Sequence, residues 1–273
     1  MTATALYEQI CRKQSFLCVG LDCDLRRLPA CLSADAEPLW TFNRAIIDAT
    51  ADVAVACKPN TAFYEALGAA GWRQLEKTVR YIRRQYPDLF IIADAKRGDI
   101  GNTSRRYAEA FFDTLDVDAV TLSPYMGRDT VQPFLEYPGK WAALLALTSN
   151  ASAADFEMLP VGSGSRLYET VLHTSKAWGT TDNTMYVVGA TQAAMLADVR
   201  KIVPDHFLLV PGVGAQGGSL EEVARYGLND RYGLLVNISR DILFADSSPR
   251  FAAAAAAKAK EWQERMRLLM VNG

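Results

Sequence analysis

Asp94, Lys96 and Asp99 carry the clearest chemical signal in the sequence. They lie in the run Asp94-Ala-Lys-Arg-Gly-Asp-Ile-Gly-Asn-Thr103, directly after the apolar segment 89–93, which predicts a buried strand. Because side chains alternate along a strand, Asp94 and Lys96 are expected on the same side of it. Two carboxylates around one ammonium are costly to assemble in a partly dry site unless they perform work. We therefore predict an acid–base array at the end of this strand.

Lys96 in this array is suited to carbanion chemistry. A lysine between two aspartates stays protonated, since opposite charges nearby favour the charged form, and a protonated lysine is a poor Schiff-base nucleophile. It can instead stabilise or protonate a carbanion. Lys58, after the neighbouring predicted strand, can pair with Asp94 and keep the array near neutrality. A substrate anion beside Asp94 would be repelled until it left or lost its charge, so the pattern predicts decarboxylation with Lys96 as proton donor.

Eight short apolar segments must position these residues. Most are continuous hydrophobic runs, which is typical of strands buried on both faces of a parallel sheet. Helical patterns alternate with them, at 41–51, 72–86, 102–115, 191–202 and 219–226. We predict an α/β fold, a single-domain (β/α)8 TIM barrel that forms one catalytic domain over 1–273. A doubly wound sheet is the alternative, although no Gly-x-Gly-x-x-Gly follows the first strand. The segments are Phe16–Leu21, Val53–Cys57, Leu89–Ala93, Ala119–Leu122, Leu144–Leu147, Met185–Val188, Phe207–Val210 and Leu234–Val236.

In a barrel of this kind the chemistry takes place at the C-terminal ends of the strands. Polar residues follow most of the predicted strands. Any one of them could be a solvated residue at the start of a loop, but their convergence on one rim favours a site. They are Asp22, Lys58 with Asn60, the array at 94–99, Ser123, Thr148 to Asn150, and Ser239 with Arg240.

The segment 211–218, Pro-Gly-Val-Gly-Ala-Gln-Gly-Gly, predicts a phosphate site. Its four glycines allow backbone amides to approach an anion closely. The helix predicted from Ser219 adds the positive end of its dipole, and Arg240 can bind an oxyanion with two parallel hydrogen bonds. The alternative is a flexible loop with a surface arginine. We favour phosphate because loops after strands seven and eight commonly bind it in this fold.

Composition restricts the class of protein. The chain has 273 residues, 50% of them hydrophobic, and a net charge of −2, which argues against a nucleic-acid or membrane surface. No apolar run approaches the roughly 20 residues that span a bilayer. The apolar stretch 16–21 follows two basic residues but is too short for a secretion signal. An odd number of cysteines, five, indicates reduced thiols and a cytoplasmic setting.

Two features admit other interpretations. Cys18 and Cys23 could bind a metal, but the two histidines, His173 and His206, lie far from them in sequence, so we expect no metal site. The segment 150–179, rich in Ser, Gly and Ala, is either a mobile cover of the active site or a plain surface excursion. The C-terminal segment, from Phe251 on, predicts a closing helix with Ser248 as its cap and Pro249 in its first turn.

On these residues the chain resembles the orotidine 5′-phosphate decarboxylase family, in its longer bacterial-type branch, type 2. The run 94–103 is similar to the signature of that family without departure, and Pro211-Gly-Val-Gly-Ala-Gln216 is similar to its phosphate loop. The matching strand ends are Gly20-Leu-Asp22, Lys58-Pro-Asn60, Thr148-Ser-Asn150 and Ser239-Arg240. The resemblance implies a cytoplasmic lyase of pyrimidine (UMP) biosynthesis that decarboxylates orotidine 5′-phosphate without metal or cofactor.

The resemblance also implies a role for each site residue. Lys96 protonates C6 of the pyrimidine, and Asp94, Lys58 and Asp99 complete an alternating charge network. Asp99 and Thr103 reach into the partner's site, so a homodimer is implied. The substrate-binding residues are Asp22 and Lys58 at the ribose hydroxyls, Ser149 at the pyrimidine edge, Gln216 and Arg240 at the 5′-phosphate, and Pro211, Ser239 and Thr103 beside them.

Two rival functions remain at this stage. The Asp-x-Lys-x-x-Asp spacing is shared with Mg²⁺-dependent enzymes, the 3-keto-gulonate-phosphate decarboxylases and hexulose-phosphate synthases. Those enzymes use a metal-bound enediolate and would be sensitive to EDTA. A non-catalytic nucleotide-binding module would bind UMP without turnover, but such a module has no physical reason to keep a costly charge cluster.

Overall fold

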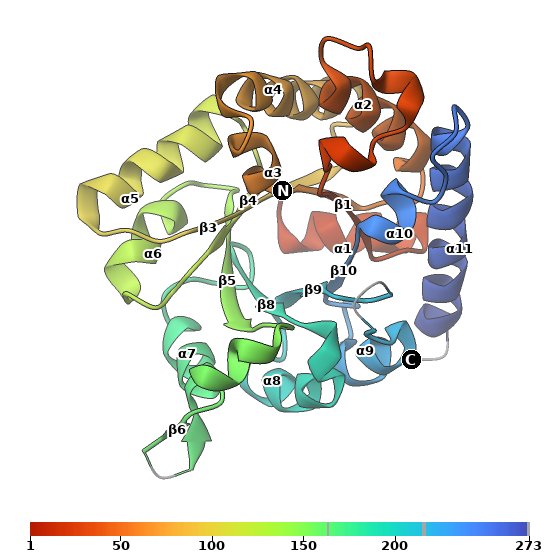
Figure 1. Cartoon of the computed structure of the whole chain (residues 1–273). Coiled ribbons are helices and arrows are strands. Elements are labelled where there is room, and N and C mark those ends of the chain that lie inside the picture. Colours follow the sequence, from red (N-terminus) through yellow and green to blue (C-terminus); the bar gives the residue numbers. More distant parts are fainter. Residues whose placement is uncertain (163, 215–216, 272–273) are drawn as a thin grey trace.

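Eight parallel strands close into a barrel at the centre of the molecule, with helices around it (Figure 1). The computed structural model describes residues 1–162, 164–214 and 217–271. Around the barrel the strands follow the order β1-β10-β9-β8-β5-β4-β3-β2, which confirms the predicted (β/α)8 barrel. The strands are β1 (Leu17–Leu21), β2 (Ala56–Pro59), β3 (Phe90–Arg97), β4 (Ala119–Leu122), β5 (Trp141–Leu147), β8 (Thr184–Val188), β9 (Phe207–Pro211) and β10 (Leu234–Ile238).

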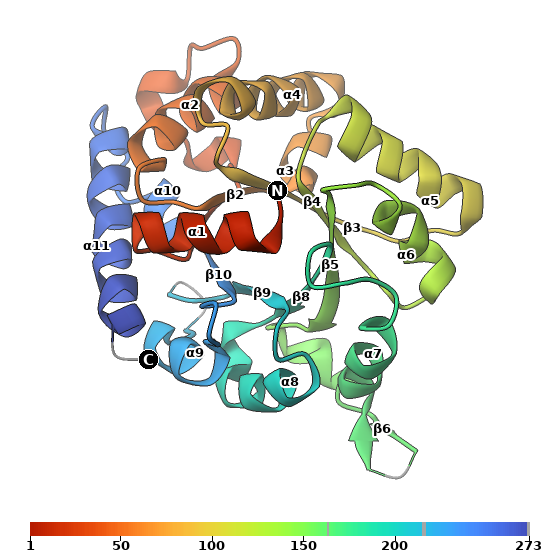
Figure 2. The ribbon, with the colours of Figure 1, turned by 180° about the vertical axis from the view of Figure 1, so that it is seen from behind.

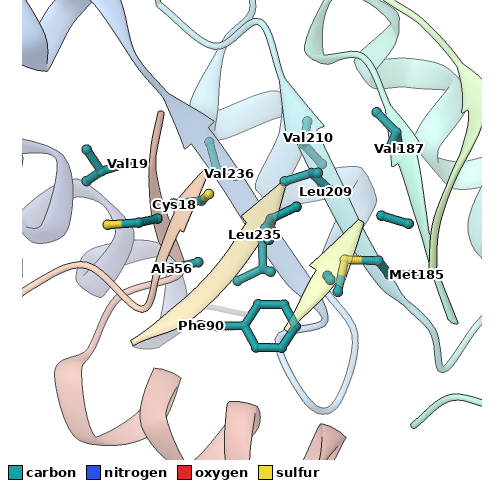
Figure 3. Packing of buried hydrophobic residues seen from close by; sticks show 14 of the residues in the cluster. Cys18, Val19, Ala56, Phe90, Met185, Val187, Leu209, Val210, Leu235 and Val236 are labelled. Carbon is teal, nitrogen blue, oxygen red and sulfur yellow. The ribbon is translucent and has the colours of Figure 1, made fainter. Parts of the chain in front are cut away.

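The strands are buried almost along their whole length. Every residue of β1, β4, β8 and β10 is buried, as continuous apolar runs predict when both faces of a strand are covered. Figure 3 shows side chains from different strands packed together, among them Phe90, Met185, Leu209 and Leu235. The barrel interior is therefore a packed core, and any site must lie at one of its ends.

Three predicted strand boundaries were wrong by three residues or more, and the first is the end of β3, which extends to Arg97 rather than stopping at Ala93. β2 begins at Ala56 rather than Val53, because the amides of Val53 and Ala54 both bond to the carbonyl of Thr50 and finish the preceding helix. β5 begins at Trp141, three residues before the predicted start, and its early alanines are fully buried. Alanine adds little to a hydrophobic run, so the sequence pattern gave no sign of them.

The helices between the strands agree with the predicted pattern, except that two of the predicted helices are each divided into two elements. The helix predicted over 102–115 is α5 (Gly101–Ala108) followed by a π-helical turn, Glu109–Thr114. The one predicted over 191–202 is a 3₁₀ turn, Ala190–Met195, and then α8 (Leu196–Ile202). The other helices are α1 (Ala3–Lys13), α2 (Pro38–Thr50), α3 (Thr61–Glu65), α4 (Gly68–Gln85), α6 (Arg128–Leu135), α7 (Leu167–Ser175), α9 (Leu220–Gly227), α10 (Arg240–Leu243) and α11 (Phe251–Val271), with short 3₁₀ turns at Leu25–Arg27, Ala30–Leu32 and Ala151–Asp155.

Helix α1, which the sequence analysis missed, covers the end of the barrel where the strands begin (Figure 2). The ammonium of Lys13 donates to the carbonyls of Ala51 and Ala54, just before β2. The indole N–H of Trp141, at the start of β5, donates to the carbonyl of Met1 at 2.7 Å. The opposite end, where the strands finish, is thus the open one. None of the described helices is long and apolar enough to cross a membrane.

The segment 150–179 forms an excursion from this open end. A short exposed hairpin, β6 (Pro160–Val161) with β7 (Ser165–Arg166), projects away from the barrel in Figure 1, and α7 follows it. The base of the excursion is tied down, because the carboxylate of Glu157 accepts hydrogen bonds from the amide and the hydroxyl of Thr148 at 2.7 and 2.8 Å. The two short strands of the hairpin are therefore at the surface, whereas the base of the excursion lies next to the end of β5.

Candidate active site

A cavity of about 270 Å³ opens at the C-terminal ends of the strands. This volume is near the lower end of the range for ligand pockets. Two lysines and one arginine against two aspartates leave its lining with one net positive charge, which suits an anion. The predicted residues that line it are Asp22, Lys58, Asp94, Lys96, Ser149, Pro211, Ser239 and Arg240.

Asp94 joins two lysines at the centre of this cavity. Its Oδ2 lies 2.7 Å from Nζ of Lys58, and its Oδ1 lies 2.5 Å from Nζ of Lys96. The side chain of Lys58 is only 4% exposed, whereas that of Lys96 is 52% exposed. The pairing predicted between Lys58 and Asp94 is thus present, and of the two lysines Lys96 has the side chain more open to a ligand.

The charges of the array hold its members ionised. Burial alone would raise the pKa of Asp94, but Lys58 and Lys96 outweigh it and the pKa falls well below its ordinary value. Burial would likewise lower the pKa of Lys58, but the carboxylates of Asp94 and Asp22 outweigh it and raise the pKa. At neutral pH the array therefore presents a fixed carboxylate between two ammonium groups.

Asp22, at the end of β1, adds a second carboxylate to the cavity. Its Oδ1 lies 3.9 Å from Nζ of Lys58, too long for a hydrogen bond. Among the described residues this buried oxygen has no hydrogen-bond donor. A buried acceptor without a donor is costly, so the site is prepared to receive a hydroxyl or amine from a ligand.

Thr121 belongs to the site, although the sequence analysis did not select it. It is buried in β4 and lines the cavity beside Asp94, to which its hydroxyl donates at 3.0 Å. The signal that could have found it is weak: it is the one polar residue in the apolar run Ala119–Leu122. Asn237 of β10 also lines the cavity and was not selected for a role.

Close approach between strand ends shapes the rest of the rim. A Cβ on Gly189, after β8, would lie 2.6 Å from the backbone nitrogen of Ser149, so only glycine lets the end of β5 come this near. A Cβ on Gly20, in β1, would lie 2.8 Å from Cβ of Ser239. The hydroxyl of Ser239 donates to the carbonyl of Gly20 at 3.2 Å. Both predicted serines are therefore held at the cavity by a glycine opposite them.

The predicted phosphate site is described in part. Pro211 and Arg240 line the cavity, and among the described residues the guanidinium of Arg240 has no hydrogen-bond or ion-pair partner. The amides of Gly214 and Gly218 bond within the loop itself, to the carbonyls of Gly218 and Gly212, and so stabilise its turn. Gln216 lies outside the described residues.

Asp99 and Thr103 do not reach the cavity of their own chain. Within the described residues, the carboxylate of Asp99 accepts only the amide of its neighbour Ile100, at 2.8 Å, and neither Asp99 nor Thr103 lines the cavity. Two large apolar residues in this part of the chain are exposed, Ile100 at 60% and Tyr125 at 84%. Their part in the reaction stays a prediction.

The alternative of a cysteine metal site has little geometric support. The thiol of Cys18 donates to Oδ1 of Asn237 and that of Cys23 to Oδ1 of Asn43, so the two face different partners. Burial raises the pKa of both thiols, which disfavours the thiolate that a metal requires. Among the described residues there is no group of three or more His, Cys, Asp or Glu side chains that could hold a metal ion.

Comparison with known proteins adds sequence evidence. A family model described as "Orotidine 5′-phosphate decarboxylase / HUMPS family" matches residues 16–256. The chain is 59% identical over 266 residues to the orotidine 5′-phosphate decarboxylase of Bacteroides fragilis strain YCH46, covering 97% of each chain. It is 57% identical over 270 residues to the protein of the same name from Porphyromonas gingivalis strain W83, covering 99% of this chain and 98% of that one.

Solved structures agree. The OMP decarboxylase of Leishmania donovani superposes with a TM-score of 0.85 at 37% identity, over 98% of this chain and 99% of that chain. The UMP synthase of the same organism matches with a TM-score of 0.86 at 38% identity over 97% of this chain. The match spans 55% of that longer protein, so it corresponds to one part of it.

Proposed function

The chain belongs to the orotidine 5′-phosphate decarboxylase / HUMPS family, and from this membership we propose that it converts orotidine 5′-phosphate to UMP and CO₂, the last step of de novo pyrimidine nucleotide synthesis. The observation that carries the proposal is the Lys58–Asp94–Lys96 array, set in a cavity that also holds Arg240. We further propose that residues 1–273 act as one catalytic domain. The five cysteines are all unpaired, which supports work in a reducing compartment, the cytoplasm.

The proposed reaction breaks the bond between C6 of the pyrimidine and its carboxylate. CO₂ leaves, the electron pair stays on C6, and Lys96 gives that carbon a proton. The ammonium of Lys96 stabilises the carbanion before the transfer, which is electrostatic catalysis by a preorganised charge. The neutral amine then regains its proton from solvent, to which the side chain is open.

Asp94 and Lys58 serve Lys96 in this mechanism. Asp94 holds the ammonium at 2.5 Å and also repels the substrate carboxylate until CO₂ departs. Lys58, buried behind Asp94, keeps that residue ionised. The array thus needs no metal or cofactor to stabilise the carbanion.

The remaining residues are proposed to bind the nucleotide. Oδ1 of Asp22, which has no hydrogen-bond donor among the described residues, suits a ribose hydroxyl, together with Lys58. Arg240 suits the 5′-phosphate, with Gln216, Pro211 and the adjoining amides, and Ser239 lies next to it. Ser149 is proposed for the pyrimidine edge. Binding energy at the phosphate would be used to fix the reacting ring.

A homodimer in which Asp99 and Thr103 act on the partner's substrate is also proposed. Asp99 does not line its own cavity, and the exposed apolar residues Ile100, Tyr125 and Met126 would be covered by a partner. Mixing equal amounts of two inactive variants, Lys96→Ala and Asp99→Ala, tests this arrangement. Hybrid dimers would regain one intact site, so about a quarter of wild-type activity is expected. No recovery after subunit exchange would contradict action in trans.

The activity itself is tested with protein treated with EDTA. Its addition to orotidine 5′-phosphate should deplete the absorbance of that nucleotide, and absence of turnover would overturn the proposal. Turnover of a sugar phosphate that EDTA abolishes would identify the metal-dependent rival. Binding of UMP without any turnover would identify a non-catalytic module.

A further inference from the structure

The catalytic strand β3 carries a bulge at the site. Its pairing with β4 joins Ala93 to Val120 and resumes with Arg97 opposite Leu122. Three residues of β3, 94–96, therefore face a single residue of β4, Thr121. A bulge interrupts the ladder of backbone hydrogen bonds, so its amides need other partners.

The hydroxyl of Thr121 bridges this bulge. It accepts a hydrogen bond from the backbone amide of Lys96 at 2.9 Å and donates to Oδ1 of Asp94 at 3.0 Å. A hydroxyl has one proton and two lone pairs, so both bonds can exist together. The direction is fixed, because an ionised carboxylate only accepts. Thr121 is 1% exposed, so water cannot easily replace it.

The backbone that Thr121 holds is an unusual one. Lys96 has φ of +46°, a left-handed conformation that is unfavourable for any residue with a Cβ. The ammonium of this left-handed residue lies 2.5 Å from Oδ1 of Asp94. The guanidinium of Arg97 also donates a hydrogen bond to the carbonyl of Ala95, the residue before Lys96, at 2.9 Å.

We propose that Thr121 is a positioning residue for the reaction: its hydroxyl fixes the left-handed backbone of Lys96 and the carboxylate of Asp94 at the same time, and so sets where the catalytic ammonium lies. This proposal rests on the proposed function, since it concerns the placement of the proton donor. It assigns Thr121 no contact with the reacting carbon.

Thr121→Val tests the proposal, because valine has nearly the same shape but no hydroxyl. We expect kcat to fall roughly ten- to hundredfold, the range for losing hydrogen bonds to charged or buried groups. KM and the affinity for UMP should change less than about threefold, since the phosphate and ribose contacts remain. Thr121→Ser keeps the hydroxyl and should restore kcat to within about threefold of wild type.

Thr184→Val is the matched control. Thr184 is also a buried strand threonine, at the start of β8, and among the residues that the structure describes its hydroxyl bonds only to its neighbour Asn183. Its loss should lower stability without lowering kcat. Wild-type kcat in Thr121→Val would overturn the proposal, as would an equal loss in Thr121→Ser. If Thr121→Val does not fold, Thr121→Ala repeats the test with a smaller side chain.

A crystal structure of Thr121→Val gives a second readout that needs no turnover. The left-handed φ of Lys96 or its contact with Asp94 should be lost, and an unchanged array would overturn the proposal. If wild-type protein does not convert orotidine 5′-phosphate, the proposed function fails, yet this structural readout still decides whether Thr121 positions Lys96.

Discussion

The two ends of the barrel each hold a cation that is buried or partly buried, but they neutralise it differently. At the C-terminal end, Lys58 is paired with the side chain of Asp94. At the N-terminal end, Arg200 of α8 donates, within the described part of the chain, only to backbone carbonyls, among them those of His206 and Gly233 directly before β9 and β10, at 2.6 and 2.8 Å. Burial lowers the pKa of Arg200 to about 10, so it is still charged at neutral pH.

The difference shows how one fold separates stability from chemistry. The carbonyls directly before the strands are fixed by the sheet, so Arg200, which donates to them, has no freedom to bind a ligand. Its hydrogen bonds instead hold together the loops at the N-terminal end of the barrel. At the C-terminal end the partner of the buried lysine is a side chain, and Lys96 and Arg240 keep hydrogen-bond donors for a ligand. Charges that face a cavity in this way are expected at functional sites, and fully bonded ones at structural sites.

Lys96→Ala should give the largest effect. Removing both the carbanion-stabilising charge and the proton donor should lower kcat on the order of 10⁴-fold or more. Because the ammonium is half-exposed, the free energy of unfolding should change little. Steady-state kinetics and urea unfolding measure the two quantities. Lys201→Ala, an exposed lysine at the other end of the barrel, is the control, and near-wild-type turnover of Lys96→Ala would sink the assigned role.

Arg200→Met should give the opposite result, a loss of stability without a loss of turnover. It leaves several buried carbonyls without a donor, which should lower the free energy of unfolding by about 3 kcal/mol. The kcat of the folded enzyme should be unchanged. Arg73→Met, at an exposed position of α4, should stay within about 0.5 kcal/mol of wild type. A fall in kcat with unaltered stability would break the separation between the two ends.

Arg240→Ala should give an intermediate effect that depends on the substrate. Losing a charge-assisted contact to the phosphate should lower kcat/KM roughly ten- to hundredfold. The slow turnover of orotidine, the nucleoside without the 5′-phosphate, should not change. Parallel assays on both compounds measure this, and equal losses on the two would show that Arg240 does not act at the phosphate.

A pH titration should give the smallest effect. The pKa of Asp94 is lower in the folded chain than its unfolded value of about 3.9, so the folded state binds fewer protons in that window. The stability that Asp94 contributes is therefore complete above this window and is lost as the pH falls from about 5 through 3.9 toward the folded pKa. The stability difference between wild type and Asp94→Asn, from urea unfolding, should shrink over this range. The corresponding difference for Arg200→Met should stay constant, since arginine remains protonated throughout.

Much of this contrast could be predicted from sequence, because it depends on local patterns. Strands buried on both faces give continuous apolar runs, and the polar residues that follow these runs mark the C-terminal end of the barrel. Regular alternation also predicted that Asp94 and Lys96 lie on the same side of the strand. In the structure the two are in contact and Lys96 has a left-handed backbone, which the residue types do not reveal.

The rest depends on pairing between distant segments. Thr121 lies inside an apolar run, and only the shifted register of β3 against β4 brings it to Asp94. The carbonyl partners of Arg200 come from loops that no spacing connects. Whether Asp99 acts in its own chain or in a partner is a property of assembly, so a single sequence contains no local signal for it.

The bulge in β3 also makes the reaction centre replaceable. Pairing with β4 stops at Ala93 and Val120 and resumes at Arg97 and Leu122, so residues 94–96 lie outside that ladder. An engineer could exchange this three-residue cassette for another set of acids and bases without shifting the register of the sheet. The left-handed position 96 would accept Asn or Gly more readily than Val or Ile. New chemistry on this scaffold is therefore limited less by the barrel than by one backbone angle.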